Sequence, residues 1–299
     1  MKFIHLFILA VSIQSLTSVQ PLIAQSNEPL RIVAIGAHPD DTDIQFGGTA
    51  ALFSAMGHSV KFVSLTNGDA GHYAEGGGML AKRRYAEAQE AARRLGIDAY
   101  VVLDNHDAEL QPELHIRHQV IREIREWEAD VVISHRPNDY HPDHRNTGVI
   151  VTDAAFLVIV PNVVPDTPAL KKNPLFLYYQ DRFQKPSPFE PDIAIDISDS
   201  FDAKIFALDA HESQVYEWLP SISGGIEQVP DGDQERIEWL AGQRTRRITP
   251  AVRQTLARWY GEDHAGGVEY VEAFEIAEYG SNPSEEEIRR LFPMLPQTP

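Results

Sequence analysis

The sequence predicts an α/β fold, a Rossmann-like and mostly parallel sheet with helices on both faces. From Arg31 onward, short β-branched apolar segments alternate with amphipathic segments of helical period, which is typical of parallel strands joined by helices. Polar clusters follow three of the apolar segments directly, as expected where strand ends open onto one edge of such a sheet.

Six segments are predicted to be strands, because each is short, apolar and bounded by polar residues or glycine. They are Ile32–Ala37, Val60–Leu65, Tyr100–Leu103, Val131–Ser134, Leu175–Tyr179 and Ile193–Ile197. The segments between and after them have helical patterns: Gly48–Met56, Met79–Leu95, Glu113–Trp127, the stretch from Asn146 onward, Phe201–Glu212 and Glu235–Thr245. Gly57 and Gly96 follow two of these helices as stop signals. Residues 161–174 are predicted to form a loop that could act as a lid.

The chain before this alternation has the pattern of a secretory signal peptide. Met1–Lys2 precedes an apolar run, Phe3–Val11, which is too short to cross a bilayer. The segment then turns polar and ends in Leu22–Ala24, which is typical of a cleavage site. We therefore expect export to the periplasm or extracellular space, cleavage after residue 24, and a single domain over residues 25–299. An uncleaved anchor or a buried strand is the alternative interpretation.

The composition of the 299 residues excludes several classes of protein. Lys and Arg total 26 and Asp and Glu total 44, which gives a formal net charge of −18. This charge argues against nucleic-acid binding and against docking on anionic lipid, and no later segment predicts stable membrane insertion. The absence of cysteine excludes disulfides, thiolate metal sites and cysteine nucleophiles. Any metal must be held by carboxylates and the 12 histidines. Homo-oligomers remain possible.

Three polar clusters follow predicted strands and should meet at one sheet edge. They are His38–Asp43, Thr66–Gly71 and His135–His144. Ligands of open parallel sheets bind beyond the carboxyl ends of the strands, so the clusters predict a binding site there.

In the first cluster, an imidazole and two adjacent carboxylates lie within four residues. Adjacent side chains point in different directions, so one of Asp40 and Asp41 can ligate a metal while the other faces a substrate. The alternative for each aspartate, and for Asp43, is a helix N-cap.

In the third cluster, His141 and His144 bracket Pro-Asp143. If this loop turns into a helix, positions i and i+3 share one face and both imidazoles point into one cavity. The clusters then offer two histidines and one carboxylate, which leaves positions open for water and substrate, as in catalytic zinc sites. An exposed polar loop is the alternative interpretation.

Together, several motifs resemble those of the PIG-L (LmbE-like) deacetylases, zinc-dependent enzymes that remove acetyl from N-acetylglucosaminyl compounds. The resemblance covers about residues 31–150 and continues weakly to Gln214. The matching residues are Ala37-His38-Pro39-Asp40-Asp41, Gly47-Gly48, Thr66-x-Gly68-x-x-Gly71, Arg84-x-x-Glu87, Leu95-Gly96, His141-Pro142-Asp143-His144 and, more weakly, Lys204, Ala207, His211, Ser213 and Gln214. Some members have Glu directly after the aspartate pair, where this chain has Thr42.

The resemblance implies a role for each matching residue. It implies that His38, Asp41 and His144 bind one Zn²⁺ per chain and that Asp40 is the general base. His141, held by Asp143 and protonated, would face the developing oxyanion.

The resemblance further implies that Arg84, Asn67, Asp69 and His211 contact a small-molecule or glycan substrate that carries an N-acetyl group. A salt bridge to Glu87 is the alternative for Arg84, and a plain turn is the alternative for Asp69.

Other functions use the same donors. Two histidines and a carboxylate also hold non-haem Fe(II) in oxygenases, although the strand–helix alternation does not favour that class. A metal-dependent phosphoesterase would need more ligands than these motifs supply. A non-catalytic carbohydrate-binding protein, in which the metal only orders the loops, is the third alternative.

Overall fold

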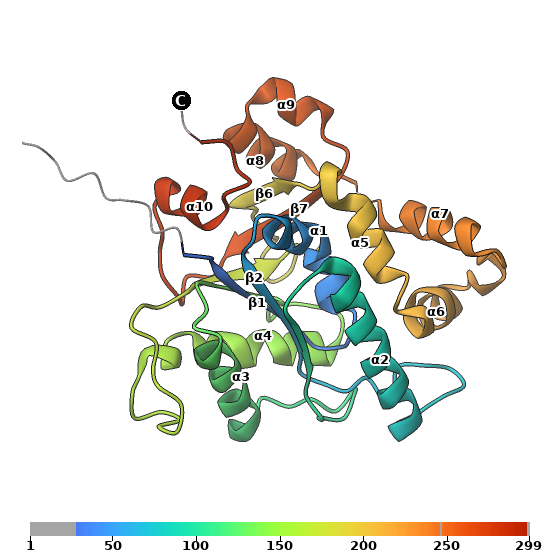
Figure 1. Cartoon of the computed structure of the whole chain (residues 1–299), viewed down its shortest axis with the longest axis horizontal. Coiled ribbons are helices and arrows are strands. Elements are labelled where there is room, and N and C mark those ends of the chain that lie inside the picture. The colour runs from blue at the N-terminus through green and yellow to red at the C-terminus, as the bar shows by residue number, and fades with distance from the viewer. Residues whose placement is uncertain (1–27, 246, 298–299) are drawn as a thin grey trace, which may run out of the picture.

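The structure, a computed structural model, describes residues 28–245 and 247–297. The predicted signal peptide and its cleavage site therefore lie outside the described residues. One seven-stranded sheet forms the centre of the molecule and is flanked by helices (Figure 1). The predicted α/β, Rossmann-like fold is confirmed.

The sheet places the ends of two strands side by side at its centre. The strands are β1 (Arg31–Gly36), β2 (Ser59–Ser64), β3 (Ala99–Val102), β4 (Val131–Ser134), β5 (Leu175–Tyr179), β6 (Ile193–Asp196) and β7 (Val271–Ile276). Their order is β3-β2-β1-β4-β5-β7-β6, with β1 to β5 parallel and β7 antiparallel to both neighbours. The chain winds from β1 out to β3 and returns to the other side of β1 at β4. In open α/β sheets, ligands bind at such a reversal, which here lies at the carboxyl ends of β1 and β4; we call this edge of the sheet the crevice.

Six of the described helices match the predicted segments, and one of these six begins much earlier than predicted. The described helices are α1 (Asp41–Ala55), α2 (Gly77–Leu95), α3 (Leu114–Glu126), α4 (Pro142–Ala155), α5 (Phe201–Leu208), α6 (Leu219–Ser223), α7 (Asp233–Arg244), α8 (Pro250–Tyr260), α9 (Glu262–Gly267) and α10 (Glu285–Leu291). The helix α1 begins seven residues before the predicted start at Gly48. Its first turns are buried nearly all round, so they lack the amphipathic period that marks a helix in the sequence.

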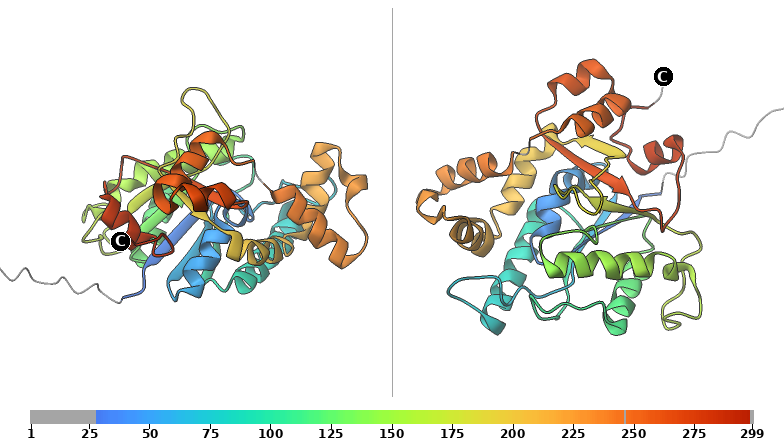
Figure 2. Two further views of the ribbon diagram at one scale, coloured as in Figure 1. Left: turned by 90° about the horizontal axis from the view of Figure 1, so that it is seen from above. Right: turned by 180° about the vertical axis from the view of Figure 1, so that it is seen from behind.

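Two hydrophobic cores cover the two faces of the sheet. Alternate residues of β1 point to opposite faces, so Ile32 joins the core under α1, α2 and α5 while Val33 joins the core under α3 and α4. Figure 2 shows the green helices α3 and α4 on the side of the strands away from the blue helix α1. The loops at the strand ends are therefore held from both faces.

Sequence analysis missed β7 and the helices α6, α8 and α9. The strand β7 contains a buried glutamate, Glu272, which accepts hydrogen bonds from the backbone N–H groups of Gly48 (3.0 Å) and Thr49 (2.8 Å) and from Lys204 Nζ (2.6 Å). A charged residue at a core position hides the apolar pattern of a strand. Its partners lie in α1 and α5, so this contact ties the end of the chain to the helix that starts at the crevice.

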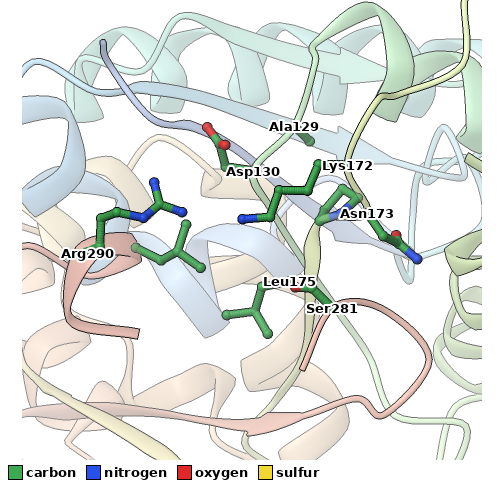
Figure 3. Close-up of a pocket in the computed structure, with 9 residues that line it drawn as sticks. Ala129, Asp130, Lys172, Asn173, Leu175, Ser281 and Arg290 are labelled. Atoms are coloured by element: carbon green, nitrogen blue, oxygen red, sulfur yellow. The ribbon is translucent and has the colours of Figure 1, made fainter. Parts of the chain in front are cut away.

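Residues 161–174 form a loop, as predicted, but this loop does not cover the crevice as a lid. The buried Arg125 of α3 donates to backbone carbonyls along this segment, including those of Val163 (2.7 Å) and Thr167 (2.9 Å). The segment leads into the start of β5, at the edge of the sheet opposite to the crevice. Figure 3 shows Lys172 and Asn173 there, beside a small pocket that Asp130 also lines.

Among the helices of the described residues, none combines the length and the apolar character that crossing a membrane requires.

Candidate metal centre and active site

The ends of β1 and β4 bring together the three predicted metal ligands. His38 lies two residues beyond β1, Asp41 begins α1, and His144 lies in the first turn of α4. Gly36 allows this close approach, because a Cβ atom there would lie 2.8 Å from the Cβ of Asp41. The sequence thus folds residues 106 positions apart into one crevice.

The three residues form a donor triangle, in which each of the two Asp41 oxygens lies near one histidine nitrogen. His38 Nδ1 lies 3.3 Å from His144 Nε2 and 3.3 Å from Asp41 Oδ2, and Asp41 Oδ1 lies 3.3 Å from His144 Nε2. Donors bound at about 2.0–2.1 Å to a tetrahedral zinc ion lie about 3.3 Å apart. All three residues are buried. The donor set therefore fits a small divalent cation.

The carboxylate of Asp41 is fixed before any cation binds. Its Oδ2 accepts the backbone N–H groups of Ala37 (3.0 Å) and His38 (2.8 Å) and lies 3.3 Å from Nε2 of His135. The neighbouring His144 and His135 outweigh the effect of burial and hold the pKa of Asp41 well below its ordinary value. The carboxylate is thus ionised and ready to ligate.

Two residues that sequence analysis did not assign support His144. His135 stacks on its ring, with centroids 4.2 Å apart, and with Asp41 and His144 it forms a second potential donor set. Asp139 Oδ1 lies 3.2 Å from His144 Nδ1. A carboxylate at the outer nitrogen of a ligating histidine fixes its orientation and leaves the inner nitrogen free for the metal. Both residues lie in the predicted polar cluster, which was the available signal.

Asp40 points toward Arg84. Its Oδ1 lies 3.0 Å from Arg84 Nη2, and Arg84, only 2% exposed, also donates to the carbonyl of Gly68 (3.1 Å). The alternative partner Glu87 instead accepts from the Ser213 hydroxyl (2.6 Å). Burial raises the pKa of Asp40, and the nearby Arg84 charge offsets only part of that rise.

His141 differs from its expected arrangement with Asp143. The backbone N–H of Asp143 donates to His141 Nδ1 (3.2 Å), so that nitrogen needs a lone pair and the proton of the neutral ring lies on Nε2. The Asp143 carboxylate instead accepts the N–H of Ala108 (2.7 Å) and lies 3.4 Å from His38 Nε2. Burial, together with the neighbouring His38 and His144, lowers the pKa of His141. Asp143 therefore holds the ring through its backbone N–H, and a neutral ring would donate from Nε2; the protonated state expected for His141 stays a prediction.

Asn67 and Asp69 hold a neighbouring loop. Asn67 Nδ2 donates to Asp104 (2.8 Å), and the Asp69 carboxylate accepts the N–H of Asp107 (3.0 Å) and lies 2.6 Å from His106 Nδ1. Their contact with a sugar stays a prediction. Their contacts in the structure bring Asp107, which no motif had indicated, to 3.1 Å from His38 Nε2.

His211 lies behind the crevice, so its predicted contact with substrate is wrong in this conformation. The side chain is 0% exposed, and its Nε2 lies 3.2 Å from Asp43 Oδ2, which also accepts from the Tyr100 hydroxyl (3.0 Å). The charge of Asp43 outweighs the burial of His211 and raises its pKa. The pair ties α1 to the residues that follow α5, in the core.

Comparisons with known proteins agree with this geometry. Residues 33–155 match the family described as PIG-L, GlcNAc-PI de-N-acetylase. A diacetylchitobiose deacetylase of Thermococcus kodakarensis is 30% identical over 202 residues, which cover 64% of this chain and 72% of the relative.

Solved structures share the fold. N,N'-diacetylchitobiose deacetylase from Pyrococcus horikoshii, in complex with an inhibitor, matches with a TM-score of 0.61 and 28% identity over 83% of this chain and 84% of that one. A 4-carboxy-2-hydroxymuconate hydratase from Pseudomonas putida has a TM-score of 0.62 at 18% identity, covers 86% of this chain and 99% of its own, and shares the fold alone. From the matched motifs, the donor triangle and these relatives, the chain belongs to the PIG-L family of deacetylases.

Proposed function

We propose that this protein is an exported, zinc-dependent amidohydrolase that removes the N-acetyl group from an N-acetylglucosamine-type sugar or glycoconjugate. The donor triangle of His38, Asp41 and His144, with the ionisable Asp40 beside it, is the observation that carries the proposal. Membership of a deacetylase family supports the reaction class, and the signal-peptide pattern supports export.

His38, Asp41 and His144 would hold the zinc ion. When bound, the ion supplies a Lewis acid that polarises an amide carbonyl and makes water a stronger acid. The chain has no cysteine, and an N₂O donor set of this kind suits a catalytic zinc with open positions.

Asp40 is suited to move the proton. A general base works best when its pKa lies nearer to the working pH than that of an exposed aspartate, and burial shifts Asp40 in that direction. Its carboxylate accepts the proton of the attacking water and later delivers it to the departing amine. Arg84 holds this carboxylate through its Nη2.

His141 is suited to the oxyanion. Because its Nδ1 is occupied by the Asp143 N–H, its Nε2–H is free to donate to negative charge that develops on the acyl oxygen. A donor in this role contributes about 2.7–4 kcal/mol to the stabilisation of the transition state. The contribution does not require an imidazolium.

The rim of the crevice suits a sugar. Tyr140, 65% exposed, lies with its ring 5.7 Å from that of His141 and 6.5 Å from that of Phe183. Aromatic surfaces beside a few fixed polar groups are typical of sites for small organic ligands. The net charge of −18 favours a neutral or cationic glycan over an anionic one.

Release of free amine from a panel of N-acetylglucosamine derivatives, with and without chelator, tests the function. We expect amine release that the chelator abolishes and zinc restores, in the protein purified from the extracellular or periplasmic fraction. Metal analysis of protein purified in air without added metal separates this function from an Fe(II) oxygenase. Sugar binding without amine release from any derivative would favour the non-catalytic binding protein instead.

A further inference from the structure

Asp107 touches both parts of the proposed machinery. It is 4% exposed, its Oδ1 lies 3.1 Å from His38 Nε2, and its Oδ2 lies 3.6 Å from Arg84 Nη1. His38 belongs to the donor triangle, and Arg84 holds Asp40. One carboxylate thus lies between the metal ligand and the partner of the base.

The loop that carries Asp107 is built to fix its position. The Asp69 carboxylate accepts the N–H of Asp107 (3.0 Å), and Asn105 Nδ2 donates to the carbonyl of Leu65 (2.7 Å). The next residue, Ala108, has a φ of 68°, a left-handed conformation that is unfavourable for a non-glycine residue. Its N–H donates to Asp143 (2.7 Å), which holds the strained turn in place. Such strain persists only where surrounding contacts impose it.

The chemistry of an imidazole ligand explains what Asp107 does. His38 faces the triangle through Nδ1, so Nδ1 must keep its lone pair and the ring proton must lie on Nε2. His38 Nε2 is buried and has no aligned hydrogen bond in this structure. The Asp107 carboxylate is its nearest acceptor, at 3.1 Å against 3.4 Å for Asp143, and Asp143 already accepts from Ala108. A carboxylate is a stronger acceptor for an N–H than an uncharged oxygen.

We propose that Asp107 is a positioning residue, which fixes the proton and ring orientation of His38 and braces Arg84 against Asp40. It couples the strength of metal binding to the placement of the base. The inference rests on the proposed function for the identity of the metal, but its central measurement does not require turnover.

The test compares Asp107→Asn and Asp107→Ala with the control Glu109→Gln, an exposed acid two residues further along the same loop. Zinc affinity is measured by competition with a chromophoric chelator, and the ligand geometry is followed by the visible absorption of the Co²⁺-substituted protein. Loss of a carboxylate that orients a ligating histidine typically weakens metal binding about 10–100-fold. We expect that loss in Asp107→Ala, a smaller loss in Asp107→Asn, an altered Co²⁺ spectrum in both, and wild-type behaviour in the control.

The outcomes separate this inference from the proposed function. Zinc affinity within two-fold of wild type, with an unchanged Co²⁺ spectrum in the isosteric and folded Asp107→Asn protein, would overturn the inference even if the wild-type protein released amine. Weakened zinc binding in a protein whose wild type releases amine from no substrate would support the inference and reject the function. If Asp107→Ala fails to fold, Asp107→Asn alone decides, because it keeps the shape of the side chain.

Discussion

Two clusters of aspartate and histidine meet the first turn of α1 and differ in almost everything but composition. At the sheet edge, donors of His38, Asp41 and His144 converge with equal 3.3 Å spacing beside the half-buried His141. In the core, Asp43 Oδ2 lies 3.2 Å from His211 Nε2 and accepts a hydrogen bond from the Tyr100 hydroxyl. Asp43 and His211 are closed to solvent. Residue type therefore does not decide the role. The edge cluster is a candidate active site because its free lone pairs converge and it has access from solvent. The core cluster lacks both features and has a structural role.

The largest effect should come from breaking the edge cluster. His144→Ala removes one corner of the donor triangle, so we expect the protein to lose its metal and to show no measurable amine release. Elemental analysis after gel filtration measures the metal per chain. The matched core variant, Asp43→Asn, should retain metal. Equal metal loss in both variants would contradict the division into an active and a structural cluster.

A second large effect should separate the two adjacent aspartates. Asp40→Asn keeps the shape but removes the base, so we expect kcat to fall about 10²–10⁴-fold, the usual contribution of general base catalysis. Metal content should not change, because Asp40 is turned toward Arg84. Steady-state kinetics and metal analysis on the same preparation measure both. Unchanged turnover would refute the assignment of Asp40 as base.

The pH profile should report the environment of Asp40. The base must be ionised to accept a proton, and burial raises its pKa, so kcat should fall on acidification at a higher pH than for an exposed aspartate with a pKa of about 3.9. Arg84 lowers this pKa, so Arg84→Met should move the acid limb to still higher pH, and Arg84→Lys should restore it in part. An acid limb that is identical in all three proteins would speak against the Asp40–Arg84 contact as the source.

The smallest effect on activity, but a clear one on stability, should come from the core cluster. We expect Asp43→Asn to reduce the free energy of unfolding by about 1–3 kcal/mol, because it leaves the buried His211 without its charged partner. The pKa of His211 is raised in the folded protein, so its contribution is present below its unfolded pKa of about 6.5 and is lost as the pH rises through the folded value. Urea unfolding across this range tests both statements, with exposed His115→Ala as control. Equal pH dependence in wild type and Asp43→Asn would contradict them.

The first half of the chain was more predictable than the second. From β1 to β4, each strand is mostly apolar and each connection is local, so the apolar pattern was enough to find the strands. In the second half, the helix expected over 201–212 ends at Leu208 and is followed by a π-helical segment, Ser213–Trp218, and β7 carries the buried Glu272. Prediction from sequence patterns relies on regular helices and apolar cores. It fails where a charged residue is buried against a partner that is distant in the sequence.

The sequence by itself determined which donors stand at the strand ends, because each motif follows an apolar run within a few residues. It also determined the family, since those motifs are local. Only the tertiary structure decided what each donor faces: Arg84 toward Asp40 rather than Glu87, Asp107 toward His38, and His211 toward the core. These contacts join residues that are 44 to 168 positions apart in the chain. One of the residues, Asp107, lies in a loop whose course is set by its neighbours. Sheet order and side-chain packing bring such residues together, and neither is written in the local spacing of any one segment.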